Sequence, residues 1–298
     1  MTGMEQSSIF FGPFSGQDAN IGLAKELFFS SNEGYSELYR YNKDGKFRLL
    51  KCLKPKFRGN PIYERLLRKE YEIGNELDHV NICKVYSFVE FDGIGNCIEM
   101  EYIDGSTLQE LLEEREIGAD LAKKIACEVC DALSYIHHKQ VLHRDLKPAN
   151  ILVTHNGQNV KLIDFGLADS DWHYVHKGNA GTLNYAAPEL LGNGGVDNRA
   201  DIWSLGKIIE EFGYKGGFAA VAKKCTNREK ARRYSSADEV KRALLNGNRG
   251  KYYIVGAIVA TLLIIAAGTY ILWQKESSIR AVDHIFITTG KKIIEAQS

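Results

Sequence analysis

The first part of the chain contains short apolar runs separated by turn residues. Three such runs, residues 27–30, 37–41 and 47–54, are divided by turns around Gly34 and Gly45. Apolar runs of this length between glycine-containing turns are typical of β-strands. We therefore expect a β-meander at this end of the chain.

A helical period replaces this pattern over residues 61–78. Pro61 stands near the start, where a helix tolerates proline, and apolar side chains recur at helical spacing at Ile62, Leu66, Ile73 and Leu77. Glu70 falls on the same stripe. A carboxylate on the inward face of a helix needs a cation, so the pattern predicts a buried ion pair for Glu70.

Residues 119–138 have the most regular helical pattern of the chain. Apolar residues recur there at spacings of three and four, at Leu121, Ile125, Val129, Leu133 and Ile136. This stripe predicts a long buried helix.

The six cysteines lie in apolar contexts at positions 52, 83, 97, 127, 130 and 225. This distribution favours a reducing compartment over a disulfide framework. Cys127 and Cys130 form a lone Cys-x-x-Cys without the second pair that zinc requires, so we interpret them as small core residues of a helix.

The charges balance over the whole chain, but residues 223–251 hold ten Lys or Arg against three Asp or Glu. No aromatic interleaving or nucleic-acid motif accompanies this run, so we expect no nucleic-acid partner. A solvated face is the first interpretation, and contact with anionic lipid is the second.

Four chemically suited side chains lie within twenty residues, at Asp145, Lys147, Asn150 and Asp164. Asp145 can accept the proton of an attacking hydroxyl, and Lys147 can neutralise a moving phosphoryl group. Asn150 and Asp164 offer oxygen ligands for magnesium. The spacing predicts phosphoryl transfer.

These residues stand in His-Arg-Asp-Leu-Lys-Pro-Ala-Asn (143–150) and Asp-Phe-Gly (164–166), followed by Ala-Pro-Glu (187–189). In this order the three segments resemble the eukaryotic-type (Hanks-type) serine/threonine protein kinases, in the membrane-anchored style of bacteria. The resemblance implies an α+β, bilobal fold with a β-rich small lobe and a shortened helical large lobe. It also implies ATP and Mg²⁺ as cofactors.

The resemblance assigns the nucleotide-positioning lysine to Lys51, paired with Glu70. Lys54 is the competing candidate, but choosing it would break the match of the flanking apolar positions. The family's three phosphate-loop glycines fall on Ser31, Glu33 and Ser36. Because side chains here hinder close approach to phosphate, the sequence leaves open a weak affinity for ATP.

Residues 96–108 resemble the last small-lobe strand and the connection between the lobes. Met100 would stand at the back of the adenine pocket, and backbone groups of Glu101 and Ile103 would bind the base. Lys147 resembles the residue that separates serine/threonine kinases from most tyrosine kinases.

Further roles follow only from the family pattern. Arg144 would pair with a phosphorylated activation loop, for which Ser170 is the main acceptor. Thr182 would contact the catalytic aspartate. Glu189 is expected to form a structural ion pair with Arg233.

Residues 254–273 run for twenty positions without a formal charge, which is long enough for a helix to cross a membrane. Four basic residues precede this segment within fifteen positions and two follow it within the same distance. The positive-inside rule then places the kinase domain in the cytoplasm and the tail outside. A buried soluble helix is the alternative.

The sequence thus predicts a single-pass protein of the cell membrane that transfers the γ-phosphoryl group of ATP to Ser or Thr of a protein substrate. The alternatives are a pseudokinase scaffold and a kinase of a small molecule or lipid. Membrane lipid is an expected partner through the helix, and a dimer is left open. The expected divisions are a lead-in segment (1–24), a kinase domain (25–246, with lobes of about 25–103 and 104–246), a juxtamembrane stretch (247–253), a transmembrane helix (254–273) and a tail (274–298).

Overall fold

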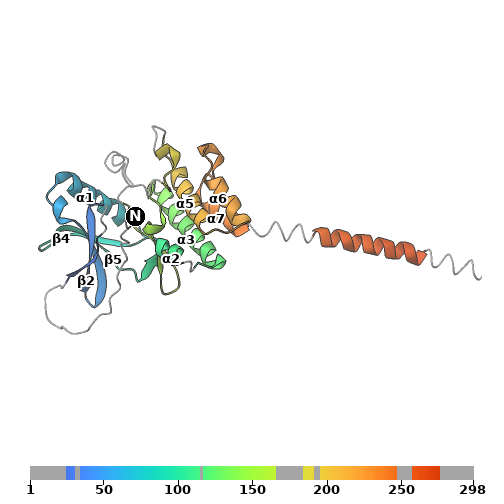
Figure 1. Cartoon of the computed structure of the whole chain (residues 1–298), viewed down its shortest axis with the longest axis horizontal. Coiled ribbons are helices and arrows are strands. Elements are labelled where there is room, and N and C mark those ends of the chain that lie inside the picture. The colour runs from blue at the N-terminus through green and yellow to red at the C-terminus, as the bar shows by residue number, and fades with distance from the viewer. Residues whose placement is uncertain are drawn as a thin grey trace, which may run out of the picture. The chain divides into compact units, whose positions relative to one another are not determined.

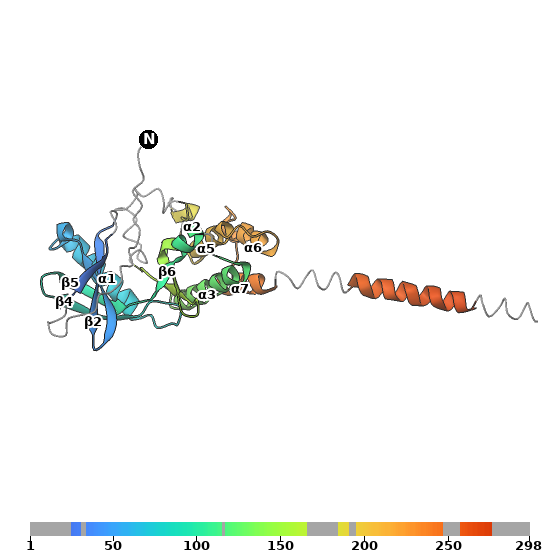
Figure 2. The ribbon, with the colours of Figure 1, turned by 60° about the horizontal axis from the view of Figure 1, so that its bottom comes forward.

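The computed structural model describes residues 25–30, 34–114, 117–165, 184–190, 195–246 and 257–275. The chain divides into two compact units, Met1–Leu245 and Asn246–Ser298. The first unit contains a β-rich lobe and a helical lobe (Figures 1 and 2). The second contains the helix Ala257–Lys275, which is long and apolar enough to span a membrane.

The small lobe is built on a five-stranded antiparallel sheet with the order β1-β2-β3-β5-β4. Asp44 and Gly45 connect β2 to β3, and both have positive φ angles, 53° and 78°. A two-residue turn of this conformation matches the twist of the strands it joins. The expected meander is therefore present, and its strands are β1 (Lys25–Phe29), β2 (Ser36–Lys43), β3 (Lys46–Leu53), β4 (Val85–Phe91) and β5 (Gly95–Glu101).

Helix α1 (Pro61–Asn75) packs against this sheet. Asn60 caps it by accepting a hydrogen bond from the N–H of Ile62 at 3.0 Å. Its buried residues are Leu67, Glu70 and Gly74. The predicted burial of Glu70 is confirmed, but the expected apolar stripe is wrong at Ile62, which is 62% exposed.

The sheet pairs two of the six cysteines, whereas the sequence favoured a reducing compartment over a disulfide framework. Cys52 in β3 lies opposite Cys97 in β5, and the structure joins their sulfur atoms in a disulfide bond. Their Cα atoms are 4.4 Å apart, the separation of a non-hydrogen-bonded antiparallel pair. The strand register therefore creates this contact. Cys127 and Cys130 are buried free thiols, as predicted for core residues.

The large lobe is organised around α3 (Ala119–His138), whose bounds match the predicted helix. Ile125, Val129, Leu133 and Ile136 are all at most 1% exposed and join the main core of the lobe. A three-stranded sheet, β6-β7-β8, lies in the same lobe. The remaining elements within the described residues are β6 (Gly105–Thr107), α2 (Leu108–Glu114), β7 (Ile151–Thr154), β8 (Val160–Leu162), α5 (Arg199–Glu211), α6 (Gly217–Cys225) and α7 (Ala237–Asn246), with 3-10 turns at Pro55–Phe57, Pro148–Asn150, Pro188–Leu190 and Lys230–Arg232.

Candidate active site

An ion-pair network links the small lobe to the large lobe. The Lys51 ammonium lies 2.5 Å from Glu70 Oε1 and 3.1 Å from Asp164 Oδ1. The side chains of Lys51 and Glu70 are 9% and 7% exposed, so the pair is almost fully withdrawn from water. Strand β3, helix α1 and the segment after β8 therefore meet at one lysine, as expected for Lys51 rather than Lys54.

Burial acts differently on the two partners. It acts to lower the pKa of Lys51, but the carboxylates of Asp164 and Glu70 outweigh it and hold this pKa above its ordinary value. Burial raises the pKa of Glu70, and the attraction of Lys51 opposes this rise. Lys51 is therefore kept as a cation.

Asp145 is held by its neighbours in the catalytic loop. Its Oδ2 accepts a hydrogen bond from the Asn150 amide at 3.0 Å and lies 2.8 Å from Lys147 Nζ. The other oxygen, Oδ1, is buried and has no hydrogen-bond partner among the described residues. Because a buried acceptor is normally satisfied, this oxygen is suited to receive a substrate hydroxyl.

Asp201 of α5 holds the backbone of the catalytic loop. No role for this residue followed from the sequence patterns. Asp201 is fully buried and accepts hydrogen bonds from the backbone N–H groups of His143 and Arg144, at 2.9 and 2.8 Å. Burial acts to raise the pKa of Asp201, but His137 at 2.8 Å and these N–H groups hold it below its ordinary value. The sequence signal that could have identified Asp201 is the motif Asp-Ile-Trp-Ser-Leu-Gly, which follows Ala-Pro-Glu.

The candidate metal ligands are brought together by a backbone contact. The N–H of Ile163 donates to the carbonyl of Asn150 at 3.1 Å, which places Asp164 beside the catalytic loop. Asp164 has a φ of 65°, a left-handed conformation that aspartate tolerates better than most residues. His143 packs against Phe165, with ring centroids 5.2 Å apart.

The donor set fits a magnesium ion shared with a nucleotide. The Asn150 amide nitrogen donates to Asp145, which leaves its amide oxygen as a ligand atom, and the Asp164 side chain is 43% exposed. Mg²⁺ in such sites takes one or two protein ligands and completes its shell with phosphate and water. In the described residues there is no cluster of three or more His, Cys, Asp or Glu that would hold a metal by protein ligands alone.

The phosphate loop is described only in part. Ser31 and Glu33 lie outside the described residues, and Ser36 begins β2. Gly34 has a φ of 84°, and its carbonyl accepts a hydrogen bond from Lys54 at 3.0 Å. The ammonium of Lys54 is therefore bound to this loop, whereas that of Lys51 lies between two carboxylates. The effect of the missing glycines on ATP affinity stays a prediction.

Tyr35 belongs to this site, although no sequence pattern indicated it. Tyr35 is 8% exposed, and its hydroxyl donates to Glu70 Oε2 at 3.4 Å. It belongs to a buried cluster with Leu53, Leu67 and Ile98. An aromatic residue inside the loop was visible in the sequence, but its inward direction depends on the packing of α1.

The connection between the lobes follows β5. Met100 lines a small cavity together with Lys51, Glu70 and Asp164. Its position at the back of an adenine pocket stays a prediction. The N–H of Glu101 donates to the carbonyl of Lys84 at 2.8 Å. The assignment of the backbone of Glu101 and Ile103 to the adenine base stays a prediction.

The segment after the metal loop contains Ser170, the predicted phosphorylation acceptor, and Thr182, the predicted contact of the catalytic aspartate, and both lie outside the described residues. The expected ion pair of the large lobe is confirmed. The Arg233 guanidinium binds both carboxylate oxygens of Glu189, at 2.6 and 2.9 Å, and the arginine side chain is fully buried. It is part of the scaffold of the large lobe.

A five-stranded sheet with one packed helix, joined to a helical lobe at a Lys-Glu-Asp network, defines a bilobal kinase fold. The family model described as "Protein kinase domain" matches residues 34–243. The chain belongs to the protein kinase family, as the motifs predicted.

Bacterial relatives of the chain are named as serine/threonine kinases. The chain is 35% identical over 191 residues to a probable serine/threonine-protein kinase of Streptomyces coelicolor, covering 60% of this chain and 28% of that protein. It is 33% identical over 167 residues to serine/threonine-protein kinase PrkC of Bacillus subtilis, covering 55% of this chain and 26% of that protein. The chain thus spans less than a third of the length of these curated relatives.

Among solved structures, the PknI kinase domain of Mycobacterium tuberculosis has the same fold. The TM-score is 0.59 with 26% identity, and the match covers 76% of this chain and 96% of that domain. This likeness supports the bilobal architecture. The protein kinase family as a whole uses ATP and a divalent metal ion.

Proposed function

We propose that this chain is an ATP-dependent serine/threonine protein kinase. Two features of the site support the proposal most directly. Asp145 Oδ1 lacks a hydrogen-bond partner among the described residues, and Lys51 forms a buried ion pair with Glu70. Phosphoryl transfer requires a positioned hydroxyl and a cation on the phosphates, and these two features supply them.

In the proposed mechanism each side chain has a separate task. Asp145 orients the substrate hydroxyl and accepts its proton, while Asn150 fixes Asp145 through the hydrogen bond at 3.0 Å. Lys147, 2.8 Å from Asp145, supplies positive charge beside the transferred group. Bound ATP and Mg²⁺ would supply the phosphoryl donor and neutralise its charge, with Asn150 and Asp164 as protein ligands.

Lys51 acts on the nucleotide from the other lobe. Glu70 and Asp164 keep it charged and fix its direction, so its ammonium can bind phosphate oxygens without first losing a water shell. Asp201 holds the backbone of the catalytic loop at His143 and Arg144. These contacts restrict the position of Asp145 before substrate binds.

The test is transfer of label from γ-labelled ATP by the purified full chain, with acid hydrolysis to identify the labelled amino acid. We expect magnesium-dependent label on phosphoserine or phosphothreonine. Nucleotide binding without any transfer would identify a scaffold. Label confined to a lipid extract would identify a lipid kinase, and either result would contradict the proposal.

We also propose that the helix Ala257–Lys275 anchors the kinase in the cell membrane with the catalytic domain in the cytoplasm. The support is its apolar length and the excess of basic residues on its N-terminal side. Protease added to intact cells should leave the kinase domain whole. Digestion of that domain from outside would reverse the proposed orientation.

A further inference from the structure

Tyr35 lies in the phosphate loop, and its side chain is part of the core of the small lobe. It is 8% exposed and belongs to the buried cluster of Leu53 from β3, Leu67 from α1 and Ile98 from β5. Its ring also packs on Tyr63 of α1, with centroids 5.7 Å apart. One residue of the loop is therefore buried between the sheet and α1.

The main chain around Tyr35 is fixed by Lys54. The N–H of Lys54 donates to the carbonyl of Tyr35 at 2.9 Å, and its ammonium donates to the carbonyl of Gly34 at 3.0 Å. These two carbonyls belong to the peptide groups before and after the Tyr35 Cα. The backbone that directs the side chain inward is therefore held on both sides.

The hydroxyl of Tyr35 reaches the ion pair of the active site. It donates to Glu70 Oε2 at 3.4 Å, whereas Lys51 lies 2.5 Å from Oε1. Burial and the negative charge of Glu70 raise the pKa of Tyr35, so the phenol keeps its proton and acts as the donor. The two oxygens of one buried carboxylate thus have different donors, one from the phosphate loop and one from β3.

A second donor restricts the orientation of the Glu70 carboxylate. The last torsion of a glutamate side chain has a broad minimum, so a carboxylate that is held through one oxygen can still rotate. With Tyr35 bound to Oε2, this rotation would break a hydrogen bond in a buried site, where such a loss is costly. Because Glu70 binds Lys51, the hydroxyl of Tyr35 also limits the movement of the Lys51 ammonium.

From these contacts we infer that Tyr35 is a positioning residue for nucleotide binding. It holds Glu70, and through Glu70 it keeps Lys51 in the direction that the phosphates of ATP require. It also connects α1 to a loop in which Ser31, Glu33 and Ser36 occupy the expected glycine positions. This role rests on the proposed function for the identity of the ligand, and it adds a residue that the proposed mechanism does not use.

Tyr35→Phe tests this role, because it removes the hydroxyl and leaves the ring in the core. The affinity of the full chain in detergent micelles for a non-hydrolysable ATP analogue with Mg²⁺ is measured by isothermal titration calorimetry. A separation of 3.4 Å is long for a hydrogen bond between two oxygen atoms, so we expect a moderate effect, an affinity about fivefold weaker than that of the wild type. A thermal unfolding midpoint is measured for each variant.

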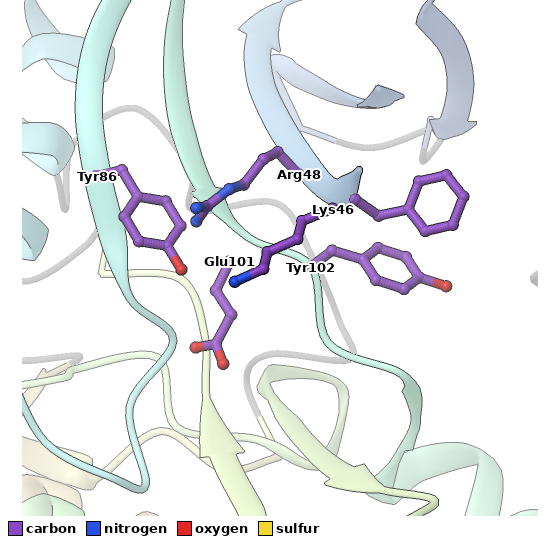
Figure 3. Close-up of a pocket in the computed structure, with 6 residues that line it drawn as sticks. Lys46, Arg48, Tyr86, Glu101 and Tyr102 are labelled. Atoms are coloured by element: carbon purple, nitrogen blue, oxygen red, sulfur yellow. The ribbon is translucent and has the colours of Figure 1, made fainter. Parts of the chain in front are cut away.

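Two other tyrosines provide matched controls. Tyr63→Phe makes the same change in the ring that packs on Tyr35, and the Tyr63 hydroxyl forms no hydrogen bond within the described part of the chain. Tyr86 of β4 lies elsewhere in the sheet, with its ring centroid 3.6 Å from the Arg48 guanidinium (Figure 3). Tyr63→Phe and Tyr86→Phe should both bind the analogue as tightly as the wild type.

A comparison with Glu70→Gln shows whether Tyr35 acts through Glu70. If it does, adding Tyr35→Phe to Glu70→Gln should change the affinity by less than about twofold, because the ion pair that the hydroxyl supports is already lost. A purely structural role of Tyr35 would instead lower the unfolding midpoint in both backgrounds and leave the affinity unchanged.

Four results would overturn the inference. They are the absence of binding to the wild type, equal affinities of Tyr35→Phe and the wild type, an equal loss of affinity in Tyr63→Phe, and a loss from Tyr35→Phe that persists in the Glu70→Gln background. The predicted affinities without any transfer of label from ATP would contradict the proposed function and still support the role of Tyr35.

Discussion

Replacing Glu70 with glutamine tests the network that joins the two lobes. The substitution keeps the size of the side chain and removes its charge, so Lys51 retains Asp164 at 3.1 Å and loses the carboxylate at 2.5 Å. Removal of one partner from a buried ion pair costs about 3–5 kcal/mol, and the remaining carboxylate places this case at the lower end. We expect the free energy of unfolding to fall by about 3 kcal/mol.

The same change should affect the use of ATP. With one carboxylate left, the Lys51 ammonium shifts toward Asp164 and away from the phosphate site. We expect kcat/KM for ATP to fall about 100-fold, which corresponds to about 2.7 kcal/mol of transition-state stabilisation. Urea unfolding followed by tryptophan fluorescence gives the first quantity, and label transfer at varied ATP gives the second.

Glu72→Gln is the matched control in the same helix. Glu72 lies two positions after Glu70 and is exposed, so the same chemical change removes a solvated charge. Both quantities should stay within about 0.5 kcal/mol of the wild type. If Glu70→Gln behaves like Glu72→Gln in unfolding and in kcat/KM, the Lys51–Glu70 pair does not support nucleotide binding and the reasoning fails.

Two further predictions concern stability. Glu189→Gln leaves the fully buried Arg233 without its carboxylate, so the free energy of unfolding should fall by about 3–5 kcal/mol in urea titrations, and an unchanged midpoint would contradict the assigned ion pair. Burial acts to raise the pKa of Glu99, but hydrogen bonds from Lys43, Ser87 and Tyr41 hold it at about 2, below its ordinary 4.5. Because its pKa is depressed in the folded protein, ionised Glu99 stabilises the fold above pH 4.5, and this stabilisation is lost toward pH 2. Between pH 5 and 2 the free energy of unfolding of the wild type should therefore fall by about 3 kcal/mol more than that of Glu99→Gln. If both proteins lose the same free energy of unfolding between pH 5 and 2, this prediction is refuted.

Periodicity and spacing were sufficient to predict much of the fold and of the site. The stripe from Ile125 to Ile136 gave the bounds of α3 without error, because a fully buried helix carries a strong apolar repeat. The spacing of Asp145, Asn150 and Asp164 along the chain indicated a shared site. This was possible because the residues that phosphoryl transfer requires are close together in the sequence.

Features that depend on how strands pair were not predictable in the same way. The contact of Cys52 with Cys97 requires the β3–β5 register, which joins positions 45 residues apart. The hydrogen bonds from the catalytic loop to Asp201 cross 58 and 57 positions of sequence. No local pattern encodes such contacts, because they follow from the packing of whole elements.

The helical period of α1 was detected, but its inward face was assigned too broadly. Ile62 shares the spacing of Leu66 and Ile73 yet lies in the first turn of α1, where it is 62% exposed. Glu70 is buried because Lys51 supplies the compensating charge. Helical spacing identifies the residues that share one face of a helix, but the elements packed against that face determine which of these residues are buried.

The central claim is that Asp145 performs the proton transfer at a site whose nucleotide contacts are made by other residues. Its most direct test is to measure the rate of label transfer by Asp145→Asn together with the affinity of the same protein for ATP and Mg²⁺. Removal of a general base costs about 10²–10⁴ in rate. We predict a loss of this size with ATP affinity within about threefold of the wild type. Transfer at the wild-type rate would contradict the account.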